Sequence, residues 1–159
     1  MSDWLVVDEL APDVADAVLA PLYEAAARGE LSMPFCGACG VPLELDQDVC
    51  DACRAREVAW RGVEPRGIVH SSTLVHRREA GLILVDHPYP VLDVELDSGH
   101  RVVMTTLTSS TTAPGIGDPV EVGFRHVGST AVPAARVVRA QLAEEKITHP
   151  EATIPEGSS

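Results

Sequence analysis

The four cysteines constrain the fold of this chain more than any other feature of its sequence. They form two close pairs, Cys36 with Cys39 and Cys50 with Cys53, in the spacing C-x2-C-x10-C-x2-C, and the chain has no other cysteine. Two such pairs can present four thiolates to one ion in a tetrahedron, so the spacing predicts a structural Zn²⁺ site. A complete set of four ligands leaves no open position at the metal, which indicates that the metal stabilises structure and performs no chemistry.

Two disulfide bonds or a redox-active C-x-x-C are the alternative interpretations of these cysteines. Disulfide frameworks are typical of small secreted domains, and the sequence shows no basic start followed by an apolar stretch that would form a secretory segment. A thioredoxin-like motif uses one C-x-x-C after a strand in a βαβ unit, whereas two pairs occur here in a turn-rich stretch. The metal site is therefore the favoured interpretation.

The composition limits the kind of core and the compartment. Apolar residues make up 45% of the 159 residues, but aromatic residues only 4%, so we expect a core of Val, Leu, Ala and Ile. No apolar run approaches the length of a membrane span. These features predict a cytoplasmic protein that does not enter a membrane, where the thiols stay reduced and available to a metal.

The charge of the chain argues against binding to nucleic acid. The formal net charge is -12; residues 1–35 hold seven acidic residues against one arginine, while residues 61–139 hold eight of each sign. Nucleic-acid binding draws much of its affinity from cationic side chains that neutralise phosphates, and single strands also need aromatic side chains for stacking. A single-stranded nucleic-acid binder therefore stays only as an alternative function.

The N-terminal third is predicted to be an arm followed by helix. Residues 1–10 are typical of an irregular or strand-like arm, and residues 13–20 have helical propensity. Pro21 should break that helix and start another, which Gly29 would end. Leu22 and Tyr23 in this second helix either pack against the rest of the chain or dock on a partner, because short helices need tertiary contacts.

After the cysteines the pattern changes to strands. We expect strands over residues 67–76, 90–96, 101–107, 120–125 and 132–138, because these stretches are β-branched or alternate between apolar and polar residues. Turn-rich links join them and no long helix intervenes. This order predicts a mainly β protein whose C-terminal part is a small five-stranded antiparallel barrel of the OB type.

Several stretches, taken in order, resemble the DUF35 family, which combines an N-terminal helix, a rubredoxin-like zinc ribbon and an OB-fold, and whose members are associated with acyl-CoA enzymes. The resemblance covers about residues 20–138. It rests on the helix and its Gly29-Glu30-Leu31 exit, the cysteine pairs, Trp60 after the ribbon, and the strand and hairpin motifs at residues 66–73, 88–99 and 117–122. The segments at residues 64–65 and 77–87 depart from the family pattern.

The resemblance implies a non-catalytic accessory subunit. Family members work beside a thiolase-fold protein that acts on acyl-CoA thioesters, and this chain is most similar to the stand-alone partner of a lipid-transfer-protein-like aldolase of steroid side-chain degradation. The resemblance also implies a hetero-oligomer, with Leu22, Tyr23 and Trp60 as candidate partner contacts and acyl-CoA as a candidate ligand at the shared interface. A thiolase, an acyltransferase or a MaoC-like hydratase is an alternative partner.

The residues themselves offer no independent catalytic machinery. The six histidines are scattered, no cysteine lies outside the two pairs, and no G-x-S-x-G elbow or phosphate loop is present. A self-contained enzyme is therefore the third and weakest hypothesis. The expected organisation is an N-terminal arm and helices over residues 1–31, a zinc ribbon over 32–59, an OB-fold barrel over 60–139 and a flexible acidic tail over 140–159.

Overall fold

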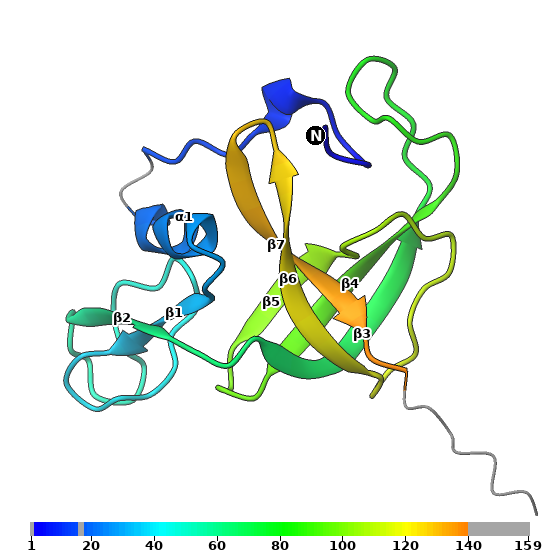
Figure 1. Cartoon of the computed structure of the whole chain (residues 1–159). Helices are drawn as coiled ribbons and strands as arrows, with labels where there is room; N and C mark the ends of the chain where they lie inside the picture. The colour runs from blue at the N-terminus through cyan, green and yellow to red at the C-terminus, as the bar shows by residue number, and fades with distance from the viewer. Residues whose placement is uncertain (1, 16–17, 140–159) are drawn as a thin grey trace, which may run out of the picture.

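The described part of the chain folds into a small two-stranded sheet and a five-stranded barrel. One α-helix, which precedes both in the sequence, packs against both. The computed structural model describes residues 2–15 and 18–139, so the predicted tail lies outside the described residues. The elements, in chain order, are the 3₁₀ turn η1 (Asp8–Leu10), helix α1 (Ala20–Ala27) and strands β1 (Ser32–Cys36), β2 (Val58–Gly62), β3 (Arg66–Val75), β4 (Tyr89–Leu96), β5 (Arg101–Thr105), β6 (Pro119–Val127) and β7 (Thr130–Val137). Figure 1 shows α1 and the β1–β2 sheet on one side and the barrel on the other.

All five predicted barrel strands are present, with ends that differ by at most two residues from those expected. Their order in the sheet is β5-β4-β3-β6-β7, and every neighbouring pair is antiparallel. A parallel bridge between Thr106 and Ala135 then brings the two edge strands together, so the barrel is nearly closed. The prediction of a mainly β protein with a five-stranded OB-type barrel is confirmed.

As the composition predicts, the buried core contains almost no aromatic side chains. Apolar residues at alternate positions of the strands point inward and are fully buried, among them Val69, Leu92, Val94 and Val120. Met33 of β1 joins the same cluster, so the small sheet and the barrel share one core. Within residues 2–15 and 18–139 no helix has the length and apolar character needed to cross a bilayer.

The helix prediction was only partly right. α1 begins at Ala20 with Pro21 in its first turn and ends before Gly29, whose φ of +75° closes the helix. The predicted helix over residues 13–20 is absent from the described residues before Ala20: Asp13 is irregular, turns occupy residues 14–15 and 18–19, and Ala20 already belongs to α1. The carboxylate of Asp13 instead accepts the N–H of Ala15 at 2.9 Å, a local bond that competes with helical backbone.

The N-terminal arm is held against the barrel by contacts that the sequence did not reveal. Val6 pairs with Ile83 in an antiparallel bridge, and the indole N–H of Trp4 donates to the carbonyl oxygen of Thr106 at 3.1 Å. The buried carboxylate of Asp3 forms an ion pair with Arg125 and accepts N–H groups of its own arm. The arm is thus an integral part of the folded chain.

Candidate metal centre

The two cysteine pairs lie on two similar knuckles of the ribbon. The first knuckle follows β1, and there the N–H of Gly40 donates to the carbonyl oxygen of Cys36 at 2.8 Å. The second knuckle repeats this turn, with the N–H of Arg54 donating to Cys50 at the same distance. The residue after each pair has positive φ, +78° at Gly40 and +66° at Arg54. The local backbone therefore aims both pairs toward one point.

The four sulfur atoms meet at that point. Every pair of Sγ atoms lies within 4.8 Å, and the Cys36–Cys53 and Cys39–Cys50 separations are 3.5 and 3.6 Å. A tetrahedral ion with metal–sulfur bonds of about 2.3 Å requires sulfur–sulfur separations of about 3.8 Å. A disulfide would need about 2.05 Å, and the structure has all four thiols free. The arrangement fits one tetrahedral ion bound by four sulfurs.

Hydrogen bonds and the close approach of the sulfurs shift the pKa values of the Cys36 and Cys53 thiols in opposite directions. The backbone N–H of Cys39 stabilises the Cys36 thiolate and lowers its pKa to about 6. The N–H of Ala55 favours the Cys53 thiolate, but the sulfurs of Cys36 and Cys39 together with burial raise the pKa of Cys53 to about 12. A divalent ion would remove this opposition, because it stabilises all four thiolates at once.

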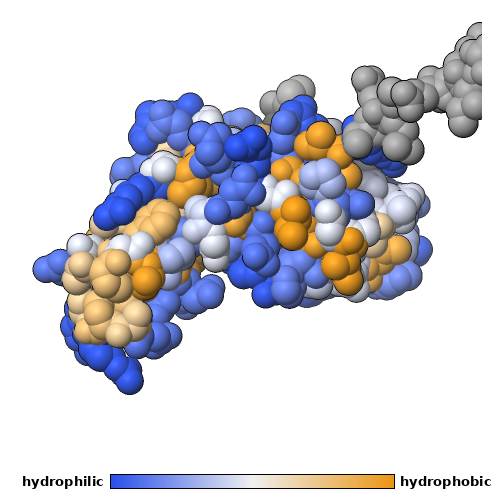
Figure 2. Space-filling view, turned by 90° about the horizontal axis from the view of Figure 1, so that it is seen from below, coloured by the Kyte–Doolittle hydropathy of each residue, from blue (hydrophilic) through white to orange (hydrophobic). Residues whose placement is uncertain are grey.

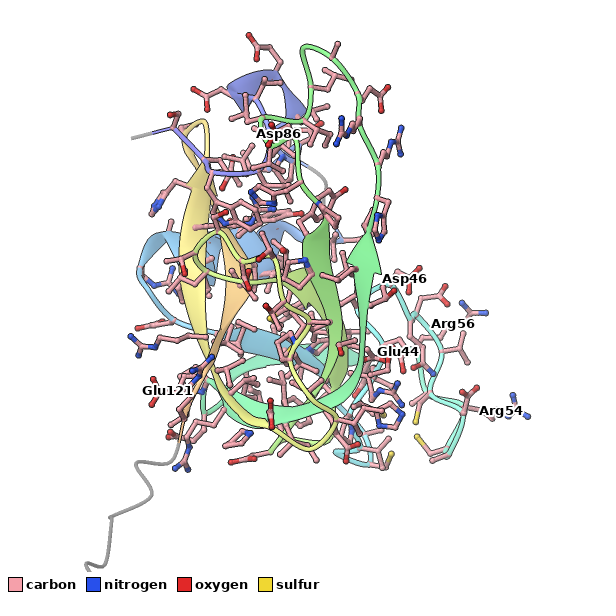
Figure 3. All side chains as sticks on the ribbon, turned by 90° about the vertical axis from the view of Figure 1, so that its right-hand side faces the viewer. Glu44, Asp46, Arg54, Arg56, Asp86 and Glu121 are labelled. Carbon is pink, nitrogen blue, oxygen red and sulfur yellow. The ribbon has the colours of Figure 1, made fainter. Side chains whose placement is uncertain are left out.

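The ribbon exposes one side of the cysteine cluster. Cys36 and Cys50 are buried, whereas Cys39 and Cys53 are exposed. Figure 2 shows a pale apolar surface over the ribbon end of the molecule, where Ala38, Ala52 and the two outer cysteines are exposed. In Figure 3, Arg54 and Arg56 project outward from the loop that carries the sulfur atoms. The end of the ribbon is therefore accessible to solvent or to another protein.

The three residues predicted to contact a partner occupy different environments. Leu22 is 5% exposed and belongs to the core, which is the packing alternative considered for it. Tyr23 is half-buried beside an apolar groove, and Trp60 is half-buried in β2, opposite Pro34 of β1. A partner contact by Tyr23 or Trp60 stays a prediction.

Among the described residues, the cysteines are the one group of three or more potential metal ligands that come together. His70 is instead beside the carboxylate of Glu95 at 3.4 Å, on the half-exposed face of the barrel. Arg101 forms an ion pair with Asp93 on the neighbouring strand. These pairs hold neighbouring strands together at the surface and form no constellation of nucleophile and base.

The fold and this site together define an OB-fold protein that carries a four-cysteine ribbon. Residues 60–125 match the family model described as the C-terminal OB-fold domain of ChsH2. A solved structure, the Ltp2-ChsH2(DUF35) aldolase, is similar over 79% of this chain and 98% of that chain, with a TM-score of 0.68 and 23% identity. No curated protein matches the sequence. The resemblance to the DUF35 family is therefore confirmed.

Proposed function

We propose that this chain is a non-catalytic accessory subunit that binds and stabilises a thiolase-fold acyl-CoA enzyme, namely a retro-aldolase of steroid side-chain degradation. The observation that carries the proposal is the similarity over 98% of the ChsH2(DUF35) chain of an aldolase. The similarity covers 79% of this chain, so most of it has a counterpart in a protein that is solved as part of an aldolase. The steroid substrate follows only from the family resemblance.

The cysteine cluster would bind Zn²⁺ as a structural ion. Cys36, Cys39, Cys50 and Cys53 supply four sulfurs, and tetrahedral sulfur coordination selects zinc among the common divalent ions. Zinc would stabilise the ribbon by neutralising the thiolates and joining the two knuckles. Because the four thiolates complete the coordination, these residues hold structure and do not touch a substrate.

Acyl-CoA would contact the chain at the shared interface. A cavity of about 670 Å³ lies between the loop after β5 and the end of β7. Its lining includes the hydroxyl residues Thr108 and Ser110, one acidic residue, Asp118, and two arginines, Arg136 and Arg139. Arginine and hydroxyl groups suit the phosphates of CoA, so this cavity is the candidate for that contact.

The test of the proposal is capture of the partner. A tagged chain is used to pull down proteins from its native extract, and the eluate is identified by mass spectrometry and then assayed for aldol cleavage of acyl-CoA substrates. We expect a thiolase-fold protein in near-equal amount and activity that requires both chains. Cleavage by the purified chain alone, or recovery of nucleic acid in place of a thiolase-fold protein, would overturn the proposal.

A further inference from the structure

The barrel has an open seam between its two edge strands, β5 and β7. A main-chain hydrogen bond joins the two sides beyond the end of β5, from the N–H of Leu107 to the carbonyl oxygen of Ala135 at 2.8 Å. Along β5 itself the only ladder is the antiparallel one with β4. The side of β5 that faces away from β4 is therefore a strand edge.

The register shows which main-chain groups of β5 point into the seam. Leu96 donates its N–H to the carbonyl oxygen of His100, so this pair is hydrogen-bonded. Hydrogen-bonded and non-bonded pairs alternate in an antiparallel ladder, and the β4–β5 ladder has no register shift. Val102 and Met104 therefore bond to β4, while the N–H and C=O groups of Arg101 and Val103 point away from it.

The opposite side of the seam is kept from closing by a proline. In the regular β6–β7 ladder, Pro133 lies opposite Phe124. Val138 donates its N–H to the carbonyl oxygen of Pro119 across this ladder, so that pair is hydrogen-bonded. Because bonded and non-bonded pairs alternate along the ladder, Pro133 belongs to a non-bonded pair and its nitrogen faces the seam. Proline has no N–H to donate, so β7 offers no donor to β5 at this position. The β5 edge is thus left available.

A groove of about 560 Å³ runs along the seam. Its walls come from the N-terminal arm and α1, and its floor comes from β5, β6 and β7; almost all of the lining is apolar. Val103 in this lining is 69% exposed and Leu10 is 45% exposed. A strand edge with an exposed apolar side chain beside an apolar groove is the arrangement that binds an extended segment of another chain.

Acidic residues that adjoin the groove-lining residues in the sequence indicate which charges the bound segment should carry at its ends. Glu9, Asp13 and Glu24 directly adjoin lining residues in the sequence, and none of them has an ion-pair partner among residues 2–15 and 18–139. Residues 1–35 carry a large acidic excess. An apolar segment with lysine or arginine at its ends would complement this rim.

We propose that the open edge of β5 binds an extended apolar segment of the enzyme partner, flanked by basic residues, as an added strand. The segment would bond to the main chain of Arg101 and Val103 and place apolar side chains in the groove. This inference rests on the proposed function and adds to it the site and the manner of docking.

Amide hydrogen exchange followed by NMR, residue by residue, tests the inference without any variant. In the free chain the amides of Arg101 and Val103 exchange at least about tenfold faster than those of Val102 and Met104, because only the latter are bonded to β4. In the complex with the thiolase-fold protein, the Val103 amide slows at least about tenfold. A complex that forms while the Val103 amide stays fast overturns this inference and leaves the proposed function standing. Failure to recover any thiolase-fold protein overturns both.

A matched pair of variants gives a second measurement. Val103→Pro removes the N–H that faces the seam and leaves the bonds of Val102 and Met104 intact, since proline is tolerated on an edge when its nitrogen faces outward. Val103→Thr keeps both the N–H and the β-branched shape. We expect the proline variant to weaken partner binding at least about tenfold and the threonine variant less than about threefold. A folded proline variant that binds as tightly as the wild type overturns the proposal, and if it does not fold, the exchange measurement decides.

Other occupants of the edge give different exchange patterns. If the Val103 amide is slow in the free chain and becomes fast when residues 140–159 are removed, the chain's own tail occupies the edge. If the amide is slow only at high concentration of the free chain, a second copy occupies it. Either result overturns the assignment to the enzyme partner.

Discussion

His100, directly before β5, donates its Nε2–H to the carbonyl oxygen of Pro34 in β1, across 2.7 Å. A carbonyl can only accept, so the neutral ring carries its proton on Nε2 and accepts the hydroxyl of Ser98 at Nδ1. The ring is 5% exposed and meets Phe35 edge to face, with 4.8 Å between the ring centroids. This one side chain therefore joins the barrel to the ribbon sheet.

Replacing His100 should loosen that junction. His100→Ala removes a buried hydrogen bond and the contact with Phe35, so we expect the free energy of unfolding in urea to fall by about 2–3 kcal/mol. His70→Ala, which changes a half-exposed histidine of the same barrel, should change it by less than about 0.5 kcal/mol. Equal effects of the two substitutions would show that the His100 bond does not hold the junction.

Removing one metal ligand should release the ion and unfold the ribbon. For Cys36→Ser and Cys50→Ser we expect bound zinc, measured by elemental analysis, to fall from one ion per chain to almost none, because structural zinc supplies folding free energy. Partner binding should be lost with it. Ala38→Ser, an exposed change within the same knuckle, serves as the control. Full zinc content and normal binding in the cysteine variants would contradict the assignment of the site.

Replacing Arg54 by glycine should stabilise the folded protein. Its φ of +66° lies in the left-handed region, where side chains other than glycine cost about 1 kcal/mol or more. Arg54→Gly should therefore raise the free energy of unfolding of the zinc-loaded protein by about 0.5–1 kcal/mol, after the greater flexibility of glycine in the unfolded chain is subtracted. Gly40→Ala at the equivalent position of the first knuckle should lower it by about 1 kcal/mol. If the two free energies of unfolding changed in the opposite directions, side-chain contacts and not backbone geometry would determine stability at these two positions.

The ion pair of Asp93 and Arg101 should contribute to stability only above acidic pH. The hydrogen bond from Arg101 lowers the pKa of Asp93 below its ordinary value. A lowered pKa stabilises the folded chain above the unfolded-state pKa, and this contribution disappears as the pH falls through the folded value. Because both groups are partly exposed, Asp93→Asn should cost less than about 1 kcal/mol at pH 7 and a smaller amount at pH 2. Urea unfolding at both values measures this, and a cost that does not depend on pH would exclude the ion pair as its source.

Tyr23 should affect partner binding more than folding. Its side chain is half-buried at the groove of the β5–β7 seam, whereas its neighbour Leu22, which also lines the groove, is buried in the core. We expect Tyr23→Asp to weaken partner binding at least about tenfold, as the loss of an interface aromatic does, while the melting temperature falls only a few degrees. Leu22→Asp should unfold the chain. A collapse of thermal stability in Tyr23→Asp would identify it as a core residue.

The strands and the cysteine cluster could be predicted because their signals are local. Alternation along residues 90–96 reports one buried face of a strand, and the spacing of two cysteines in a knuckle reports one turn. The helix over residues 13–20 was predicted wrongly, because propensity alone did not include the local bond from the N–H of Ala15 to the carboxylate of Asp13, which competes with helical backbone.

The attachment of the arm could not be predicted, since it depends on pairs that only the folded chain brings together. Nothing near Trp4 in the sequence points to Thr106, and nothing near Val6 points to Ile83. The same holds for the seam. Pro133 is visible in the sequence, but the direction of its nitrogen depends on the register of β6 and β7.

The contact between Asp3 and Arg125 spans 122 residues of the chain. During synthesis at roughly 5–20 residues per second, Asp3 therefore leaves the ribosome about 6–24 s before the arginine that neutralises it. Trp4 is likewise made before Thr106, so the arm reaches its final position only after the later strands have been made. Throughout that interval the indole and the neighbouring aliphatic side chains are open to chaperones and to other nascent chains.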